Sequence, residues 1–139
     1  MPIFDMLRRE TDIRTFTAGD AVFREGEPGR DMFVVLEGQV DLFRTVRGTE
    51  VHIAAVTRDD WFGEMSMLDV LPRPTTARVT GGARLLRLTA HDLDVLYRRD
   101  VKAYALLVLN IAREMSRRLR IADAHVAALN APAVPASDR

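Results

Sequence analysis

Residues 61–76 bring together the side chains that could bind an anionic ligand carrying hydroxyl groups. Gly63 and Glu64 stand next to each other, and Arg73 follows nine positions after Glu64. A carboxylate accepts hydrogen bonds from hydroxyl groups, a guanidinium donates paired N–H groups to phosphate oxygens, and a glycine lets the backbone approach a ligand closely. A short helix that begins at Glu64 would add unpaired backbone N–H groups near the anion. The stretch therefore predicts a binding site for a phosphate-bearing small molecule.

The same stretch resembles the phosphate-binding cassette of the cyclic nucleotide-binding domains of catabolite activator proteins, kinase regulatory subunits and nucleotide-gated channels. The residues that carry the resemblance are Phe62-Gly63-Glu64-Met65-Ser66, Pro72-Arg73 and Thr75-Thr76. The resemblance implies that Glu64 and the Gly63 amide bind the ribose 2′-hydroxyl and that Arg73 binds the cyclic phosphate. It also implies support for the phosphate from the backbone N–H groups of Met65 and Ser66.

Two positions depart from the family pattern. Pro74 stands where the family usually has a small residue that offers a backbone N–H to the phosphate, and proline has no N–H. Val70 stands where the family often has a glycine in the turn. We expect Thr75 or Thr76 to replace the missing donor, whose loss would otherwise cost roughly 1 kcal/mol.

A second stretch, residues 18–40, resembles the first half of the same domain through its paired glycines and the strand that ends before Gly38. The resemblance implies that Leu42, Ile53 and Val56 lie near the bound base, and as apolar strand residues they also fit an ordinary barrel core.

Base selection is also expected from the C-terminal helix, where catabolite activator proteins place polar side chains against adenine. This chain has Ala122 and Asp123 at the matching place. Asp123 could accept from an exocyclic amino group, although pairing with Arg120 or solvent is its favoured role. The residue directly after Arg73 is Pro74, which has no hydroxyl, and the resemblance implies that this disfavours one guanine contact of cGMP-selective relatives. The predicted ligand is therefore cAMP, with cGMP as the alternative.

The pattern between residues 13 and 89 predicts a mainly β fold. Short apolar runs alternate with glycine-bearing or charged turns. The expected strands are 13–16, 21–24, 32–36, 40–44, 50–56, 76–79 and 85–88. Together with the resemblance they indicate a double-stranded β-helix, a jelly-roll-like β-roll over about 13–89, preceded by a short helix over 2–9. Trp61 is expected as a core anchor, and Arg30 and Asp31 as a surface pair.

From Thr89 onward the apolar residues recur at the spacing of a helix. Thr89 and Asp92 are expected to form a capping box at the start of a short helix. Asp100 is expected to cap a long helix to about residue 129, so that the domain spans 1–130 and a disordered tail spans 131–139. The apolar positions of the long helix are Tyr104, Leu107, Val108, Ile111, Met115, Leu119, Ala122, Val126 and Leu129. The last five follow a four-three spacing that predicts a homodimer through this helix, although the roll itself is an alternative partner. The arginines beside this seam are interpreted as a solvated face: Arg113, Arg117, Arg118 and Arg120.

Composition narrows the function classes. The chain of 139 residues is expected to form one domain; it has no cysteine, three histidines and a formal net charge of zero. We expect no catalytic residue, no metal site and no DNA-binding domain, and a metal-dependent cupin enzyme or a Ser-His-Asp hydrolase is disfavoured. Without a signal peptide or a membrane-spanning segment, the protein is expected to be cytoplasmic.

Two functions fit these observations. The first is a stand-alone regulatory sensor that binds a cyclic nucleotide and moves its C-terminal helices to signal to a dimer mate or an effector protein. The second keeps the fold but has a degenerate pocket and acts as a ligand-independent interaction module. Ligand-dependent stabilisation would distinguish them.

Overall fold

The computed structural model describes residues 12–69 and 71–131. The predicted helix over 2–9, the departure at Val70 and most of the predicted tail therefore lie outside the described residues.

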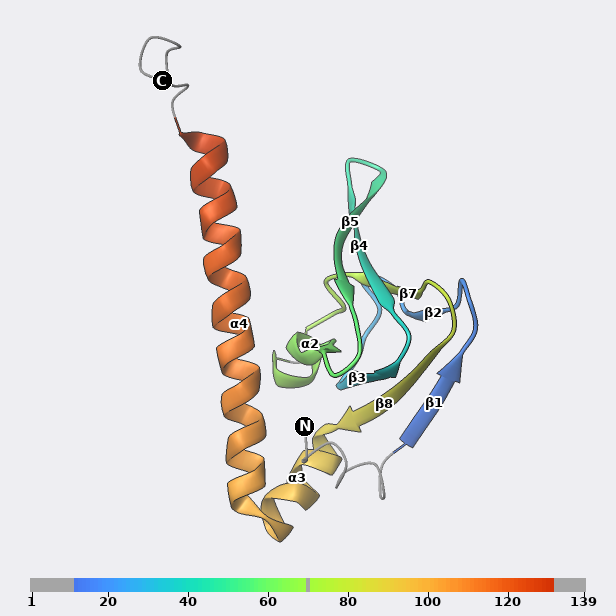
Figure 1. Ribbon diagram of the computed structural model, residues 1–139, viewed down its shortest axis with the longest axis vertical. Helices are drawn as coiled ribbons and strands as arrows, with labels where there is room; N and C mark the ends of the chain where they lie inside the picture. The colour runs from blue at the N-terminus through green and yellow to red at the C-terminus, as the bar shows by residue number, and fades with distance from the viewer. Residues whose placement is uncertain (1–11, 70, 132–139) are drawn as a thin grey trace.

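In the described part of the chain, eight strands form two antiparallel sheets that face each other (Figure 1). The first sheet has the order β1-β8-β3-β6 and the second has the order β2-β7-β4-β5. The strands are β1 Asp12–Phe16, β2 Ala21–Phe23, β3 Asp31–Glu37, β4 Val40–Val46, β5 Thr49–Val56, β6 Trp61–Phe62, β7 Thr76–Val79 and β8 Ala83–Thr89. The predicted β-roll is thus confirmed, and only the two-residue strand β6 was not expected.

The central strand β3 explains why the two sheets stack. Its middle residues form an apolar run that is buried on both faces. One face contributes Phe33 and Val35 to the core between the sheets, and the other contributes Met32 and Val34 to a second cluster beneath the helices. Burial of apolar area on both sides of one strand therefore fixes both the roll and the position of its helical cover.

Three helices complete the described fold. They are α2 Glu64–Asp69, α3 Ala90–Arg99 and α4 Val101–Asn130. Thr89 and Asp92 form the expected capping box at the start of α3, and the Asp100 side chain accepts a hydrogen bond from the Ala103 N–H at the start of α4. Both caps satisfy backbone N–H groups that a helix start leaves unpaired.

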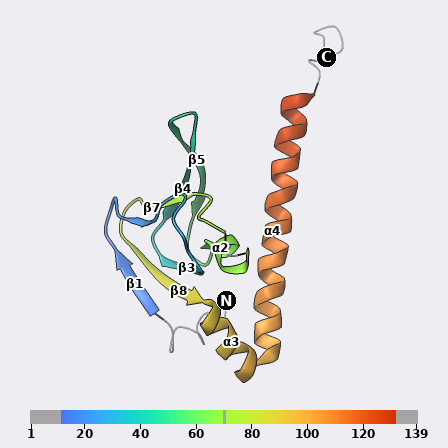
Figure 2. The ribbon, with the colours of Figure 1, turned by 180° about the vertical axis from the view of Figure 1, so that it is seen from behind.

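The long helix α4 has a packed half and an uncovered half. Leu107 and Ile111 are buried in the cluster beneath the helices, and Tyr104 and Met115 pack against it. Every residue from 119 to 131 is exposed. Figures 1 and 2 show this second half running past the roll and away from α3. Within the described residues, no helix is long and apolar enough to cross a membrane.

Candidate functional site

The cassette begins at a sharp bend between β6 and α2. Gly63 has a φ of +84°, a conformation that residues with a Cβ rarely adopt. The bend starts α2 at Glu64, and α2 buries Glu64 and Ser66 while Met65 stays exposed. The sequence prediction of a short helix start at this point is confirmed.

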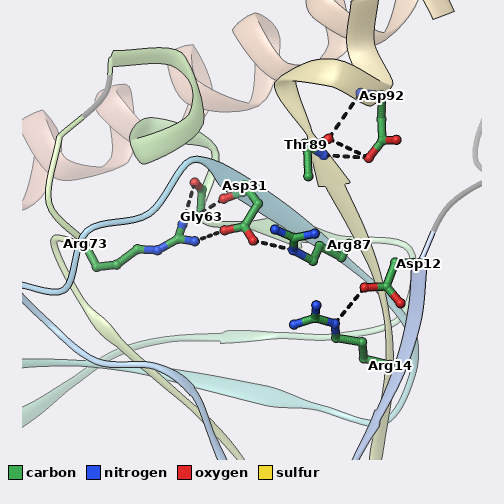
Figure 3. Close-up of polar contacts among 8 residues, drawn as sticks. All are labelled: Asp12, Arg14, Asp31, Gly63, Arg73, Arg87, Thr89 and Asp92. Atoms are coloured by element: carbon green, nitrogen blue, oxygen red, sulfur yellow. Dashed lines mark hydrogen bonds and ion pairs between the residues drawn. The ribbon is translucent and has the colours of Figure 1, made fainter. Parts of the chain in front are cut away.

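Arg73 is buried beside this bend, with only 4% of the residue exposed. Its Nη1 donates to the backbone carbonyl oxygens of Asp31 at 2.8 Å and Gly63 at 3.1 Å, and its Nη2 pairs with the Asp31 carboxylate (Figure 3). A guanidinium has five N–H donors, and these contacts use three of them. Among the described residues, the buried Nε has no hydrogen-bond partner. Arg73 is therefore held in place while part of its donor set stays unused.

The walls around the guanidinium are shaped to accept it. The Phe23 ring lies 4.1 Å from the Arg73 Cζ, close enough for a cation–π interaction. A Cβ on Gly29 would come within 2.2 Å of the Arg73 Nε, and a Cβ on Gly63 within 2.9 Å of its Nη1. Glycine at both positions leaves room for the buried guanidinium.

Asp31 connects this arginine to the strand that leads into α3. Its second carboxylate oxygen accepts from the Arg87 Nε at 2.6 Å, and Arg87 lies on β8 (Figure 3). The expectation that Arg30 and Asp31 form a surface pair is wrong, because β3 turns the Asp31 side chain inward, toward Arg73. One partly buried carboxylate thus serves two guanidinium groups.

Glu64 has a partner from α4 that the sequence analysis did not identify. Arg118 donates from Nη1 to the Glu64 Oε1 at 3.1 Å and from Nη2 to the Trp61 carbonyl oxygen at 3.2 Å. The interpretation of Arg118 as part of a solvated face is therefore wrong, since α4 passes close enough to the cassette for its side chain to reach in. Trp61 is buried, as expected of a core anchor.

The other predicted ligand residues are less closely grouped. Thr75 is half-buried, Pro74 is exposed, and the Thr76 hydroxyl oxygen accepts from the Glu25 N–H at 2.9 Å. Leu42 packs against the core between the sheets, and Val56 belongs to that core. Ile53 is 52% exposed and lies where the register of β4 with β5 shifts.

Asp123 is exposed on the uncovered half of α4. Asp123 was expected to pair with Arg120 or with solvent; its exposure fits the second, and Arg120 donates to the Ser116 hydroxyl. Nor do the described residues contain a cluster of three or more metal-ligating side chains.

Comparison with known proteins assigns the family. A family model described as "Cyclic nucleotide-binding domain" matches residues 13–100, which span the roll and α3. The chain belongs to the cyclic nucleotide-binding domain family. This family match includes every residue of the Arg73 and Asp31 contacts described above, whereas Arg118 lies beyond it.

Individual relatives agree with the family assignment. The chain is 36% identical over 111 residues to the cyclic AMP receptor protein of Thermus thermophilus, covering 79% of this chain and 50% of the relative. It is 32% identical over 77 residues to the cAMP-dependent protein kinase regulatory subunit of Mycosarcoma maydis, covering 55% of this chain and 15% of that protein. The crystal structure of the Thermus thermophilus catabolite activator protein superimposes with a TM-score of 0.80 at 32% identity, covering 92% of this chain and 59% of that one. The chain thus spans 50% of the receptor protein and 15% of the kinase subunit, and 59% of the chain in the crystal structure.

Proposed function

We propose that this domain is a regulatory sensor that binds cAMP at the cassette. The observation that carries the proposal is the buried Arg73, whose guanidinium is fixed by three acceptors while its Nε has no hydrogen-bond partner in the described part of the chain. A buried donor without a partner costs about 1–3 kcal/mol, and a phosphate oxygen would satisfy it with a charge-assisted hydrogen bond. The names of the receptor protein and the kinase subunit support cAMP as the nucleotide.

The remaining cassette residues would have the ligand-binding roles that the sequence predicts. Glu64 and the Gly63 amide would hold the ribose hydroxyl, and the first backbone N–H groups of α2 would face the phosphate. Pro74 contributes no N–H. Thr76 uses its oxygen as an acceptor for Glu25, so its own O–H is still available to donate.

Thermal unfolding of nucleotide-free protein with and without cAMP tests the proposal. Ligand at a hundred times its Kd adds about 2.7 kcal/mol to the unfolding free energy, which raises Tm by several degrees in a domain of this size. A parallel titration with cGMP tests the base preference. No shift in Tm with either nucleotide, in protein shown to be folded, would instead favour the alternative of an interaction module with a degenerate pocket. The missing backbone N–H donor at Pro74 supports that alternative.

Signalling would pass through Arg118. This side chain joins α4 to Glu64, so a sugar hydroxyl that binds Glu64 acts on the ion pair that holds α4 near the roll. A ligand shifts a conformational equilibrium only by binding one arrangement better than the other. The Arg118 contact would provide such a difference if it formed in only one arrangement of α4.

Arg118→Ala is expected to weaken cAMP binding about tenfold, or roughly 1.4 kcal/mol. The buried Glu64 carboxylate would lose the cation that orients it, while the contacts of Arg73 would stay. Isothermal titration calorimetry measures the change. Arg98→Ala is the matched control, because Arg98 is an exposed helical arginine whose ion pair is with Asp94 on its own helix. Equal affinities in the two variants would contradict the role assigned to Arg118.

The uncovered half of α4 is proposed to pair with the same helix of a second copy. Leu119, Val126 and Leu129 are exposed large apolar residues on the four-three seam. A helix that keeps an apolar stripe exposed usually has a partner for it.

Leu119→Glu combined with Val126→Glu is therefore expected to convert a dimer into a monomer, because the pair would place charges in the helix seam. Sedimentation equilibrium measures the mass in solution. Ile121→Glu is the matched control, since Ile121 is exposed and apolar but lies off the seam, and it is expected to leave the dimer intact. An unsubstituted protein that is monomeric, or a dimer that survives the double substitution, would overturn this proposal.

A further inference from the structure

One face of α4 lines a groove that lies apart from the apolar seam and adjoins the cassette stretch at Trp61. The groove has a volume of about 660 Å³. Its charged lining consists of Arg113, Arg117 and Arg120 together with one carboxylate, Glu114, and Trp61 also lines it. Arginines at these spacings lie on one face of a helix and repel one another unless an anion is near.

The one carboxylate in the lining does not neutralise the three arginines. Glu114 pairs with Arg117 and also accepts from the Arg118 Nε at 3.3 Å, so it is shared with an arginine outside the groove. The bond from Arg117, together with the charges of both arginines, lowers the pKa of Glu114 and keeps the carboxylate ionised. Glu114 is therefore already engaged by Arg117 and Arg118.

The two outer arginines keep their donors available. Arg120 donates to the neutral hydroxyl of Ser116 at 2.9 Å. Within residues 12–69 and 71–131, Arg113 forms no ion pair. Because a guanidinium has five donors and a permanent charge, Arg113 and Arg120 on either side of Arg117 offer a row of hydrogen bonds to a ligand with several anionic oxygens.

The groove lies beside the nucleotide site and does not include its central residues. Trp61 lines the groove, whereas Glu64, Arg73 and Arg118 do not. The proposed dimer seam lies on a different face of α4, so pairing of two helices would leave the groove open.

We propose that this groove is a second anion site that binds a compact phosphate-bearing ligand through Arg113, Arg117 and Arg120. The row of guanidinium groups favours the diphosphate group of a small molecule, because several acidic oxygens on neighbouring phosphorus atoms can engage neighbouring guanidinium groups at once. A nucleic acid backbone carries the same phosphate chemistry, and the experiment separates the two sources.

Titration of the protein with inorganic pyrophosphate at constant ionic strength tests the site. Isothermal titration calorimetry gives the affinity, and Trp61, the single tryptophan of the chain, reports locally by its fluorescence. We expect saturable binding that weakens at least tenfold in Arg113→Ala combined with Arg120→Ala. A short DNA duplex in a parallel titration is expected to compete poorly.

Two controls make the result specific. Arg24→Ala combined with Arg98→Ala removes the same charge at exposed positions outside the groove and is expected to keep the affinity. Arg73→Ala is also expected to keep it, which separates this site from the cassette. Absence of saturable binding, equal affinities in the two double variants, or binding only to the duplex would overturn the proposal.

Discussion

Replacing Arg73 with alanine is expected to abolish the rise in Tm that cAMP gives the unsubstituted protein. Truncating one partner of a buried, charge-assisted pair costs about 2–5 kcal/mol of binding free energy. A loss of about 3 kcal/mol corresponds to a Kd more than a hundredfold higher. Calorimetric titration with cAMP measures this loss directly, and the thermal shift measures its consequence for stability.

Arg73 also supports the fold, so the experiment needs a second variant. Alanine would leave Asp31 with Arg87 as its remaining partner and would empty the space beside Phe23. Arg73→Lys keeps the positive charge near Asp31 but lacks the planar fork that phosphate requires, and it is expected to bind cAMP weakly as well. Arg84→Ala removes an exposed arginine and is expected to bind normally. Unchanged cAMP affinity in both Arg73 variants would contradict the assignment of the site.

The parts of the site that sequence reasoning predicted are those that lie close together along the chain. Gly63 and Glu64 adjoin a helix start that the pattern itself indicates, and Arg73 follows within ten positions. The caps at Thr89 and Asp100 were also local signals, since a hydroxyl or carboxylate needs only the next three residues to form its hydrogen bond.

The contacts that were missed join distant segments. Asp31 and Arg73 are 42 positions apart, and Glu64 and Arg118 are 54 apart. The local charge pattern predicts that Arg30 and Asp31 form a surface pair and that Arg118 is solvated. Only the packing of β3 and α4 shows which of these side chains turn inward. Strand β6 was missed for a related reason: two residues are too few for an alternating pattern, and its pairing with β3 depends on the finished sheet.

The ion-pair chain from Arg73 through Asp31 to Arg87 is expected to be a major contributor to stability. Asp31→Asn keeps the shape of the side chain but leaves two guanidinium groups without their shared carboxylate. The Asp31 side chain is 14% exposed and that of Arg73 is 3% exposed, so water replaces little of the lost interaction. Breaking a buried pair from one side costs about 3–5 kcal/mol. Urea unfolding, with the slope held constant between variants, measures the change in unfolding free energy.

Glu37→Gln is the matched control for this loss. Glu37 also lies on β3 and also pairs with an arginine of β8, but both partners of the Glu37–Arg84 pair are exposed, and such a pair contributes at most about 1 kcal/mol. The two substitutions remove one charge each from the same strand, so a difference between them isolates the effect of burial. If Asp31→Asn costs no more than Glu37→Gln, the carboxylate does not hold Arg73 in place, and the fixed guanidinium would have to depend on the carbonyl oxygens of Asp31 and Gly63 alone.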